Sequence, residues 1–215
     1  MKKADVLARI TQIGIVPVLR ASSTKEALGI AHAIAAGGVP ILEVTMTVPG
    51  AIDVIAQLVA HGGDLLIGAG TVLDAETARA CILAGAQFIV SPALDLRTIE
   101  LCRKYGVPVL PGALTPTEIV TAWQAGADAV KVFPCSAVGG AKYLKAIKAP
   151  LPQIELIPTG GVSLATAAEF LEAGAFALGV GGDLADNKAM ADGHPEIITE
   201  NARKYLAITQ ARAKK

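Results

Sequence analysis

One short pattern recurs four times in the chain and restricts the fold more than any other feature. Each copy joins Ala-Gly to a following apolar run, and the copies begin at Ala36, Ala84, Ala125 and Ala173. Glycine takes the left-handed backbone conformation at little cost, so each copy is typical of a helix that ends in a tight turn into a strand. By our count the copies precede the second, fourth, sixth and eighth strands. Such repetition favours a closed (β/α)8 barrel, although an open doubly wound sheet can also repeat.

The rest of the chain continues this alternation of strands and helices. Ser23 with Glu26 has capping-box spacing, Thr115 is followed by Pro116 and Glu118, and Asp74 and Ser163 are further candidate helix caps. We therefore predict an α/β fold, a single compact (β/α)8 TIM barrel over residues 1–215, with a leading helix in residues 1–14 and a frayed tail at 210–215. The predicted strands are 15–20, 41–46, 66–72, 88–91, 107–111, 130–133, 154–159 and 177–181.

Composition and charge exclude several classes of function. The chain is 53% hydrophobic and only 4% aromatic, which suits strands of small aliphatic residues that are buried on both faces. Its formal net charge is zero, so we expect neither nucleic acid nor a membrane as a partner. The three cysteines are widely spaced, which disfavours a disulfide framework and fits a reducing cytoplasm. The histidines lie apart from any carboxylate cluster, so we expect no metal site and no cofactor.

Two charged residues interrupt apolar strands, and they are the candidate catalytic residues. Lys131 lies within Val-Lys-Val-Phe, and Glu43 within Ile-Leu-Glu-Val-Thr. A buried lysine lowers its pKa, pairs with a carboxylate, or does both. Side chains alternate along a strand, so Thr45 shares the face of Glu43, and Phe133 shares that of Lys131. If both faces line the barrel mouth, the two charges meet. The pair then suits Schiff-base chemistry with proton transfer, although a structural ion pair is the alternative.

Glycine-rich segments follow the last two predicted strands. Pro-Thr-Gly-Gly contains Thr159, Gly160 and Gly161, and Gly-Val-Gly-Gly contains Gly181 and Gly182. Turns at these two strands form the usual anion site of the (β/α)8 fold. Gly68-Ala69-Gly70-Thr71 is predicted to be a further glycine turn. Arg20 ends the first strand at the mouth, where it either binds a carboxylate or phosphate or is simply solvated.

These motifs together resemble the bacterial 2-keto-3-deoxy-6-phosphogluconate (KDPG) aldolases, which often also act on 4-hydroxy-2-oxoglutarate (KHG). The resemblance covers nearly the whole chain. It implies a metal-independent homotrimer of (β/α)8 barrels acting on a small keto acid, with the Schiff-base lysine at Lys131 and the proton-transferring glutamate at Glu43. It also implies substrate contacts at Thr71, Pro92, Phe133, Thr159, Gly160 and Gly161. The motifs are Val-Pro-Val-Leu-Arg (16–20), Leu-Glu-Val-Thr (42–45), Ile-Gly-Ala-Gly-Thr-Val (67–72), Phe-Ile-Val-Ser-Pro (88–92), Leu-Pro-Gly (110–112), Lys-Val-Phe-Pro (131–134) and Pro-Thr-Gly-Gly-Val (158–162).

The chain departs from the pattern of that family at two positions. Many members carry an arginine for the substrate carboxylate where this chain has Thr47, so we expect Arg20 to supply the charge. Members commonly have a serine for the phosphate at the position of Gly182, and here Asp183 follows, a carboxylate that is unfavourable beside a phosphate unless it points away. The resemblance thus predicts cleavage of KDPG to pyruvate and glyceraldehyde 3-phosphate. The alternatives are the galactonate epimer, a non-phosphorylated 2-oxo-4-hydroxy acid, or a non-catalytic phospholigand-binding barrel.

Overall fold

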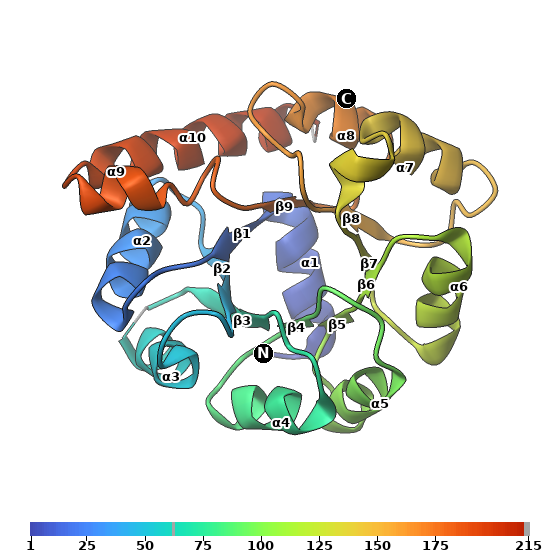
Figure 1. The fold of residues 1–215 in the computed structure, drawn as a ribbon, viewed down its shortest axis with the longest axis horizontal. Helices are drawn as coiled ribbons and strands as arrows, with labels where there is room; N and C mark the ends of the chain where they lie inside the picture. Colours follow the sequence, from blue (N-terminus) through green and yellow to red (C-terminus); the bar gives the residue numbers. More distant parts are fainter. Residues whose placement is uncertain (62, 213–215) are drawn as a thin grey trace.

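Buried parallel strands alternate with helices along the chain, as the sequence predicts. The computed structural model describes residues 1–61 and 63–212, and in Figure 1 its strands form a ring inside a shell of helices. The strands are β1 (Ile15–Leu19), β2 (Ile41–Thr45), β3 (Leu66–Gly70), β4 (Ile89–Val90), β5 (Val109–Leu110), β6 (Gly112–Ala113), β7 (Val130–Val132), β8 (Leu156–Pro158) and β9 (Leu178–Val180). The helices are α1 (Lys3–Ile13), α2 (Thr24–Ala36), α3 (Ala51–His61), α4 (Ala75–Leu83), α5 (Leu96–Tyr105), α6 (Pro116–Ala125), α7 (Ala141–Lys148), α8 (Ala167–Glu172), α9 (Asn187–Ala191) and α10 (Pro195–Arg212), with a 3₁₀ turn η1 (Cys135–Val138).

The order of strand pairing closes the ring. One sheet runs β5-β4-β3-β2-β1-β9 and a second runs β6-β7-β8, with parallel pairing throughout. The two sheets meet where Thr159 and Gly179 form a bridge, and where the Lys131 N–H donates to the Pro111 carbonyl at 2.9 Å. The first strand therefore neighbours the last, which an open doubly wound sheet does not allow. The predicted (β/α)8 architecture is confirmed.

The fifth strand of the barrel differs from the prediction, because it is interrupted. β5 pairs with β4 and β6 pairs with β7, and Pro111 separates them. Proline has no backbone N–H and cannot donate to a neighbouring strand, so the ladder breaks at this residue. The predicted run 107–111 therefore ends too early, and the barrel position is shared by two short strands.

The four repeated glycine turns are confirmed at the predicted places. The glycines of the Ala-Gly pattern in three copies, Gly85, Gly126 and Gly174, have φ values of 102°, 99° and 93° and lead towards β4, β7 and β9. In the first copy Gly37 has a φ of −78°, and the left-handed conformation falls on the next residue, Gly38, with a φ of 86°, before β2. These four strands are the even positions of the barrel, because β5 and β6 together occupy the fifth. A side chain at these φ values is strained, which explains why glycine recurs there.

Helix capping agrees with the sequence at three of the four predicted positions. Ser23, Asp74 and Thr115 each accept a hydrogen bond from a backbone N–H in the first turn of α2, α4 and α6. The prediction for Ser163 is wrong. Helix α8 begins after Thr166, whose hydroxyl accepts from the Ser163 N–H and donates to the Gly161 carbonyl at 2.9 Å. The segment before α8 is thereby folded back onto the glycine turn that follows β8.

Alternate strand residues divide the interior into two apolar cores. Those facing outward pack under the helices, and those facing inward form a smaller cluster with Val6 and Ile10 of α1. Helix α1 crosses the ring in Figure 1 and covers the amino ends of the strands, where Lys3 pairs with Asp128 at 2.8 Å. At the other terminus α10 continues through Arg212, and residues 213–215 lie outside the described residues, so the frayed tail at 210–215 stays a prediction. Within the described ranges, no helix combines the length and apolarity needed to cross a bilayer.

Candidate active site

Lys131 and Glu43 meet inside the barrel, as predicted from the alternation of strand side chains. The Lys131 Nζ lies 3.6 Å from the Glu43 Oε1, and the two residues are 5% and 2% exposed. Glu43 Oε1 is a buried oxygen that makes no hydrogen bond to any described residue. A buried ion pair is weak evidence for stability, and an unsatisfied buried oxygen is uncommon enough to mark this carboxylate as a candidate functional group. The pair is therefore buried and poorly satisfied, which makes it a candidate for chemistry rather than for cohesion.

Glycines on the inner strand faces make room for this pair. A Cβ at Gly70 would fall inside van der Waals contact with the Glu43 carboxylate, and one at Gly68 would overlap the Phe88 ring. These two glycines belong to the extended strand β3, so the predicted glycine turn at residues 68–71 is wrong. Thr71, just beyond the strand, takes a positive φ of 57°, which is unusual for a β-branched residue.

Apolar side chains and one aromatic ring surround Lys131 and Glu43. Val16, Val90, Leu110 and Ile157 line the cavity that holds Lys131 and Glu43. The Lys131 Nζ also lies 5.5 Å from the centre of the Phe133 ring, within the range of a cation–π contact. Such walls keep water from the amine and strengthen its electrostatic interactions.

A second cavity of about 270 Å³ adjoins the first at Thr159 and Gly179. It is lined by the predicted anion-binding groups, namely Arg20, Gly160, Gly161, Gly181 and Gly182, together with Val18, Phe133, Val162 and Asp183. Among the described residues, the backbone N–H groups of Gly161 and Gly182 have no hydrogen-bond partner. Free amides and a guanidinium that line one cavity form a suitable site for an anion.

Arg20, which we predicted to bind the substrate carboxylate, lies beside the glycine turns. Its guanidinium Nη1 is 3.3 Å from the position that a Cβ on Gly181 would occupy, and it lines the cavity of the turns but not that of Lys131. We expected Arg20 to bind the substrate carboxylate and the turns to bind a distant phosphate. In the structure Arg20 and the glycine turns instead line the same cavity. The role of Arg20 remains a prediction.

Asp183 points its carboxylate to groups outside the cavity. Its Oδ2 accepts hydrogen bonds from the Tyr205 hydroxyl at 2.5 Å and from the Leu164 N–H at 3.2 Å. Burial, followed by the hydrogen bond to Asp183 and the charge of its carboxylate, raises the pKa of the Tyr205 phenol, so this hydroxyl remains a donor. The sequence contains no local signal for Tyr205, because it lies on α10, 22 residues beyond its partner.

The remaining predicted residues occupy the opposite rim of the mouth. Thr45 is buried, with its hydroxyl donating to the Leu19 carbonyl at 2.9 Å and lying 2.7 Å from the Thr47 hydroxyl. Thr71 and Pro92 follow β3 and β4, and a Cβ at Gly112 would overlap the Pro92 backbone. None of the three lines either of the two cavities. Their predicted substrate contacts remain untested by the geometry.

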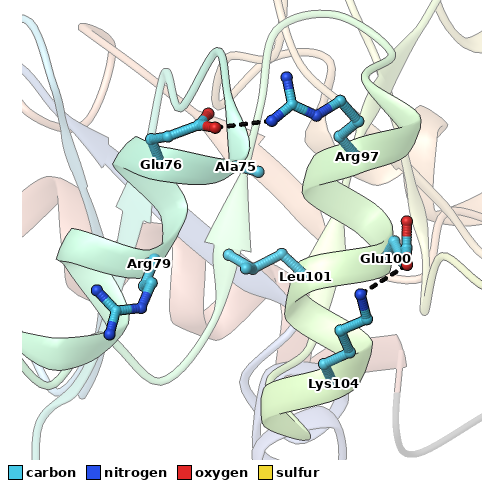
Figure 2. A pocket seen from close by; sticks show the side chains of 7 residues that line it. All are labelled: Ala75, Glu76, Arg79, Arg97, Glu100, Leu101 and Lys104. Atoms are coloured by element: carbon cyan, nitrogen blue, oxygen red, sulfur yellow. Dashed lines mark hydrogen bonds and ion pairs between the residues drawn. The ribbon is translucent and has the colours of Figure 1, made fainter.

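A charged groove between α4 and α5 is a weaker candidate, although its volume of about 250 Å³ is similar. Figure 2 shows that its charges are matched across and along the helices, with Arg97 pairing to Glu76 and Lys104 to Glu100, both at 2.7 Å. The side chains of Arg97 and Glu76 are 72% and 71% exposed. Exposed ion pairs of this kind are solvated and contribute little. The hydrogen bond and the charge of Lys104 lower the pKa of the Glu100 carboxyl, which is the ordinary effect of a surface ion pair and does not point to catalysis.

Comparison with known proteins shows the family of this chain. The family model for KDPG and KHG aldolase matches residues 6–208. The KHG/KDPG aldolase of Escherichia coli K12 is 35% identical over 205 residues, covering 95% of this chain and 96% of that protein. The 2-dehydro-3-deoxy-6-phosphogalactonate aldolase of the same strain is 39% identical over 176 residues, covering 81% and 85%. A KDPG aldolase structure from Legionella pneumophila, with pyruvate captured as a covalent carbinolamine, has a TM-score of 0.86 and 31% identity, covering 92% of this chain and 96% of that one.

Proposed function

The chain belongs to the KDPG and KHG aldolase family, whose members are class I pyruvate aldolases, and from this premise we propose that it cleaves KDPG to pyruvate and glyceraldehyde 3-phosphate. The observation that supports this most directly is the buried pair of Lys131 and Glu43 with its unsatisfied carboxylate oxygen. The proposed reaction also includes KHG, which yields pyruvate and glyoxylate.

In the proposed mechanism Lys131 is the nucleophile. Its amine attacks the C2 ketone, and loss of water gives an imine that withdraws electrons from the C3–C4 bond. The apolar walls formed by Val16, Leu110 and Ile157 exclude water from the amine during the attack. Glu43, directly or through a water molecule, accepts the proton of the C4 hydroxyl as the bond breaks. Protonation of the resulting enamine at C3 and hydrolysis then release pyruvate and regenerate the lysine.

The two cavities suggest how the substrate lies across the mouth. The pyruvate portion would occupy the space above Lys131, towards Thr71 and Pro92, which follow β3 and β4. The distal phosphate would lie between Arg20 and the free amides of Gly161 and Gly182. The place of Arg20 beside Gly181 supports this assignment over the carboxylate role expected from the sequence.

The galactonate epimer is the alternative substrate, since the galactonate enzyme of E. coli is as similar to this chain as the gluconate enzymes are. A non-phosphorylated hydroxy-oxo acid is a further alternative. Initial rates on KDPG, its galactonate epimer and KHG compare these candidates directly. A higher kcat/KM on the epimer would overturn the proposed substrate, and a higher value on KHG would remove the need for a phosphate.

The decisive experiment for the enzyme class is trapping with pyruvate and borohydride. We expect a three-carbon adduct at Lys131, located by peptide mass spectrometry, and its loss in Lys131→Ala. Lys145→Ala on α7 is a matched control, because it removes an exposed lysine from a helix. An adduct at another lysine, or none, would overturn the mechanism and leave a phospholigand-binding barrel as the alternative.

We also propose that the enzyme is a homotrimer, on the basis of its family resemblance. Light scattering coupled to size-exclusion chromatography should give three times the 21.9 kDa chain mass. A mass of one or two chains at micromolar concentration would contradict the proposal.

A further inference from the structure

Two opposite charges line the cavity of the glycine turns without pairing with each other. Arg20 and Asp183 both border this space, yet no ion pair within 4.0 Å joins them, and within the described ranges Arg20 has no carboxylate partner. Both residues are exposed, so their side chains are able to rearrange. Exposed side chains of opposite charge attract each other only weakly. A contact that holds one of them in another place is therefore enough to keep the two apart.

Asp183 is kept apart from Arg20 by hydrogen bonds to other parts of the chain, two of them to α10. Three contacts fix this residue: the Tyr205 hydroxyl and the Leu164 N–H donate to its carboxylate, and the Asn201 side-chain amide donates to its carbonyl at 3.2 Å. Tyr205 is fully buried in the outer core, so its hydroxyl is held at one place. The carboxylate is thus bound to a rigid donor behind the turn.

We propose that Tyr205 is a positioning residue that holds the Asp183 carboxylate away from Arg20 and so keeps the guanidinium free for the anionic end of the substrate. The inference rests on the proposed function, because it takes Arg20 and the glycine turns to be the phosphate site. It assigns to the last helix of the barrel a role in substrate affinity that involves no contact with the substrate.

The proposal predicts competition inside the cavity when the hydroxyl is lost. In Tyr205→Phe the buried ring keeps its packing, but the carboxylate loses a strong donor and gains freedom to approach Arg20. An exposed pair of this type is of modest strength, which corresponds to a rise of about fivefold in KM for a phosphorylated substrate. Because the pairing is intramolecular, it competes with phosphate without altering Lys131.

The test measures KM for KDPG, inhibition by inorganic phosphate and trapping of pyruvate in a small set of variants. We expect Tyr205→Phe to raise the KM and the phosphate inhibition constant about fivefold, with no change in pyruvate trapping. Adding Asp183→Asn should restore both constants to within about twofold of the original, because the competing charge is removed. Tyr143→Phe is the matched control, since it also deletes a phenol that donates to a partner, the Leu114 carbonyl, away from the cavity.

The outcomes separate this inference from the proposed function. An unchanged KM in Tyr205→Phe overturns the role of Tyr205, and so does a raised KM that Asp183→Asn fails to rescue, because that result indicates general loosening of the turn. If Tyr205→Phe does not fold, Asp183→Asn alone still decides: the inference predicts an equal or lower KM, and a higher one overturns it. Failure of the original enzyme to trap pyruvate overturns the proposed function instead.

Discussion

Gly70→Ala tests whether the open inner face of β3 is what allows Glu43 to work. A Cβ at Gly70 would lie 1.9 Å from Glu43 Oε1, whereas ordinary contact begins at 3.4 Å. The carboxylate must therefore move by about 1.5 Å, which follows from the difference between these two distances. The backbone of β3 offers little compensation, because it is paired with β2 over five residues.

The displacement is large compared with the tolerance of proton transfer. A misplacement of about 1 Å is enough to cost roughly 100-fold in rate, equivalent to about 2.7 kcal/mol in activation free energy. We expect kcat for KDPG cleavage to fall by at least this factor. The attack of Lys131 on pyruvate does not depend on the position of Glu43 to the same degree, so borohydride trapping should persist.

The assay compares kcat, trapping and thermal stability in Gly70→Ala and in Gly29→Ala. The control also adds one methyl group to a glycine, which here is half-buried on α2, and its nearest neighbour is the flexible Met190 sulfur at 3.2 Å. In a Glu43→Gln background Gly70→Ala should cost almost nothing further, because residues that act as one unit are non-additive. A folded Gly70→Ala enzyme with kcat within threefold of the original, or an additive double variant, would refute the reasoning.

Three other predictions follow from the same geometry. Glu43→Gln should form the imine but lose roughly 10²–10⁴-fold in exchange of the pyruvate methyl protons, measured by NMR in D2O. Arg20→Ala should raise the KM for KDPG by about 10- to 100-fold and leave pyruvate trapping unchanged, because only KDPG carries a phosphate. Burial raises the pKa of the Cys135 thiol to about 11, above the usual thiol value of 9.0, so stability present below pH 9 should be lost as the pH rises towards 11 and only the unfolded chain ionises. The melting temperature of Cys135→Ala should fall less steeply over that range.

Each of these has a contrary result. Unchanged proton exchange would reduce Glu43 to a structural partner of Lys131. Equal losses for KDPG and pyruvate in Arg20→Ala would return Arg20 to the carboxylate, as the sequence alone suggested. A melting temperature that declines equally steeply without Cys135 would assign the alkaline loss to other groups.

The parts of the fold that follow from local rules could be predicted from the sequence. The repeated turns depend on a single backbone conformation at Gly85 or Gly126, which only the local residue type decides. The meeting of Lys131 with Glu43 depends on the two-residue period of strands, which is equally local once a barrel is assumed.

The parts that depend on register or on distant packing could not. The break in the fifth strand at Pro111 depends on the neighbouring strands, because β5 before it pairs with β4 and β6 after it pairs with β7. The sequence alone suggests that Gly70 is a turn residue. The structure shows that glycine is needed there because the Glu43 carboxylate occupies the space of a Cβ. Tyr205 joins Asp183 through the packing of α10, and no rule of spacing within a helix or strand connects the two.

The closed end of the barrel, under α1, affects the order in which substrates would bind in the reverse, carbon–carbon bond-forming direction. Helix α1 and the inner apolar cluster fill the end opposite the mouth, beneath Lys131. In the proposed reaction the keto acid would therefore reach Lys131 only from the mouth, on the side where the aldehyde product leaves. An aldehyde bound at the mouth would lie across this path, so we expect compulsory-order kinetics, with pyruvate binding first and inhibition by excess aldehyde relieved by pyruvate.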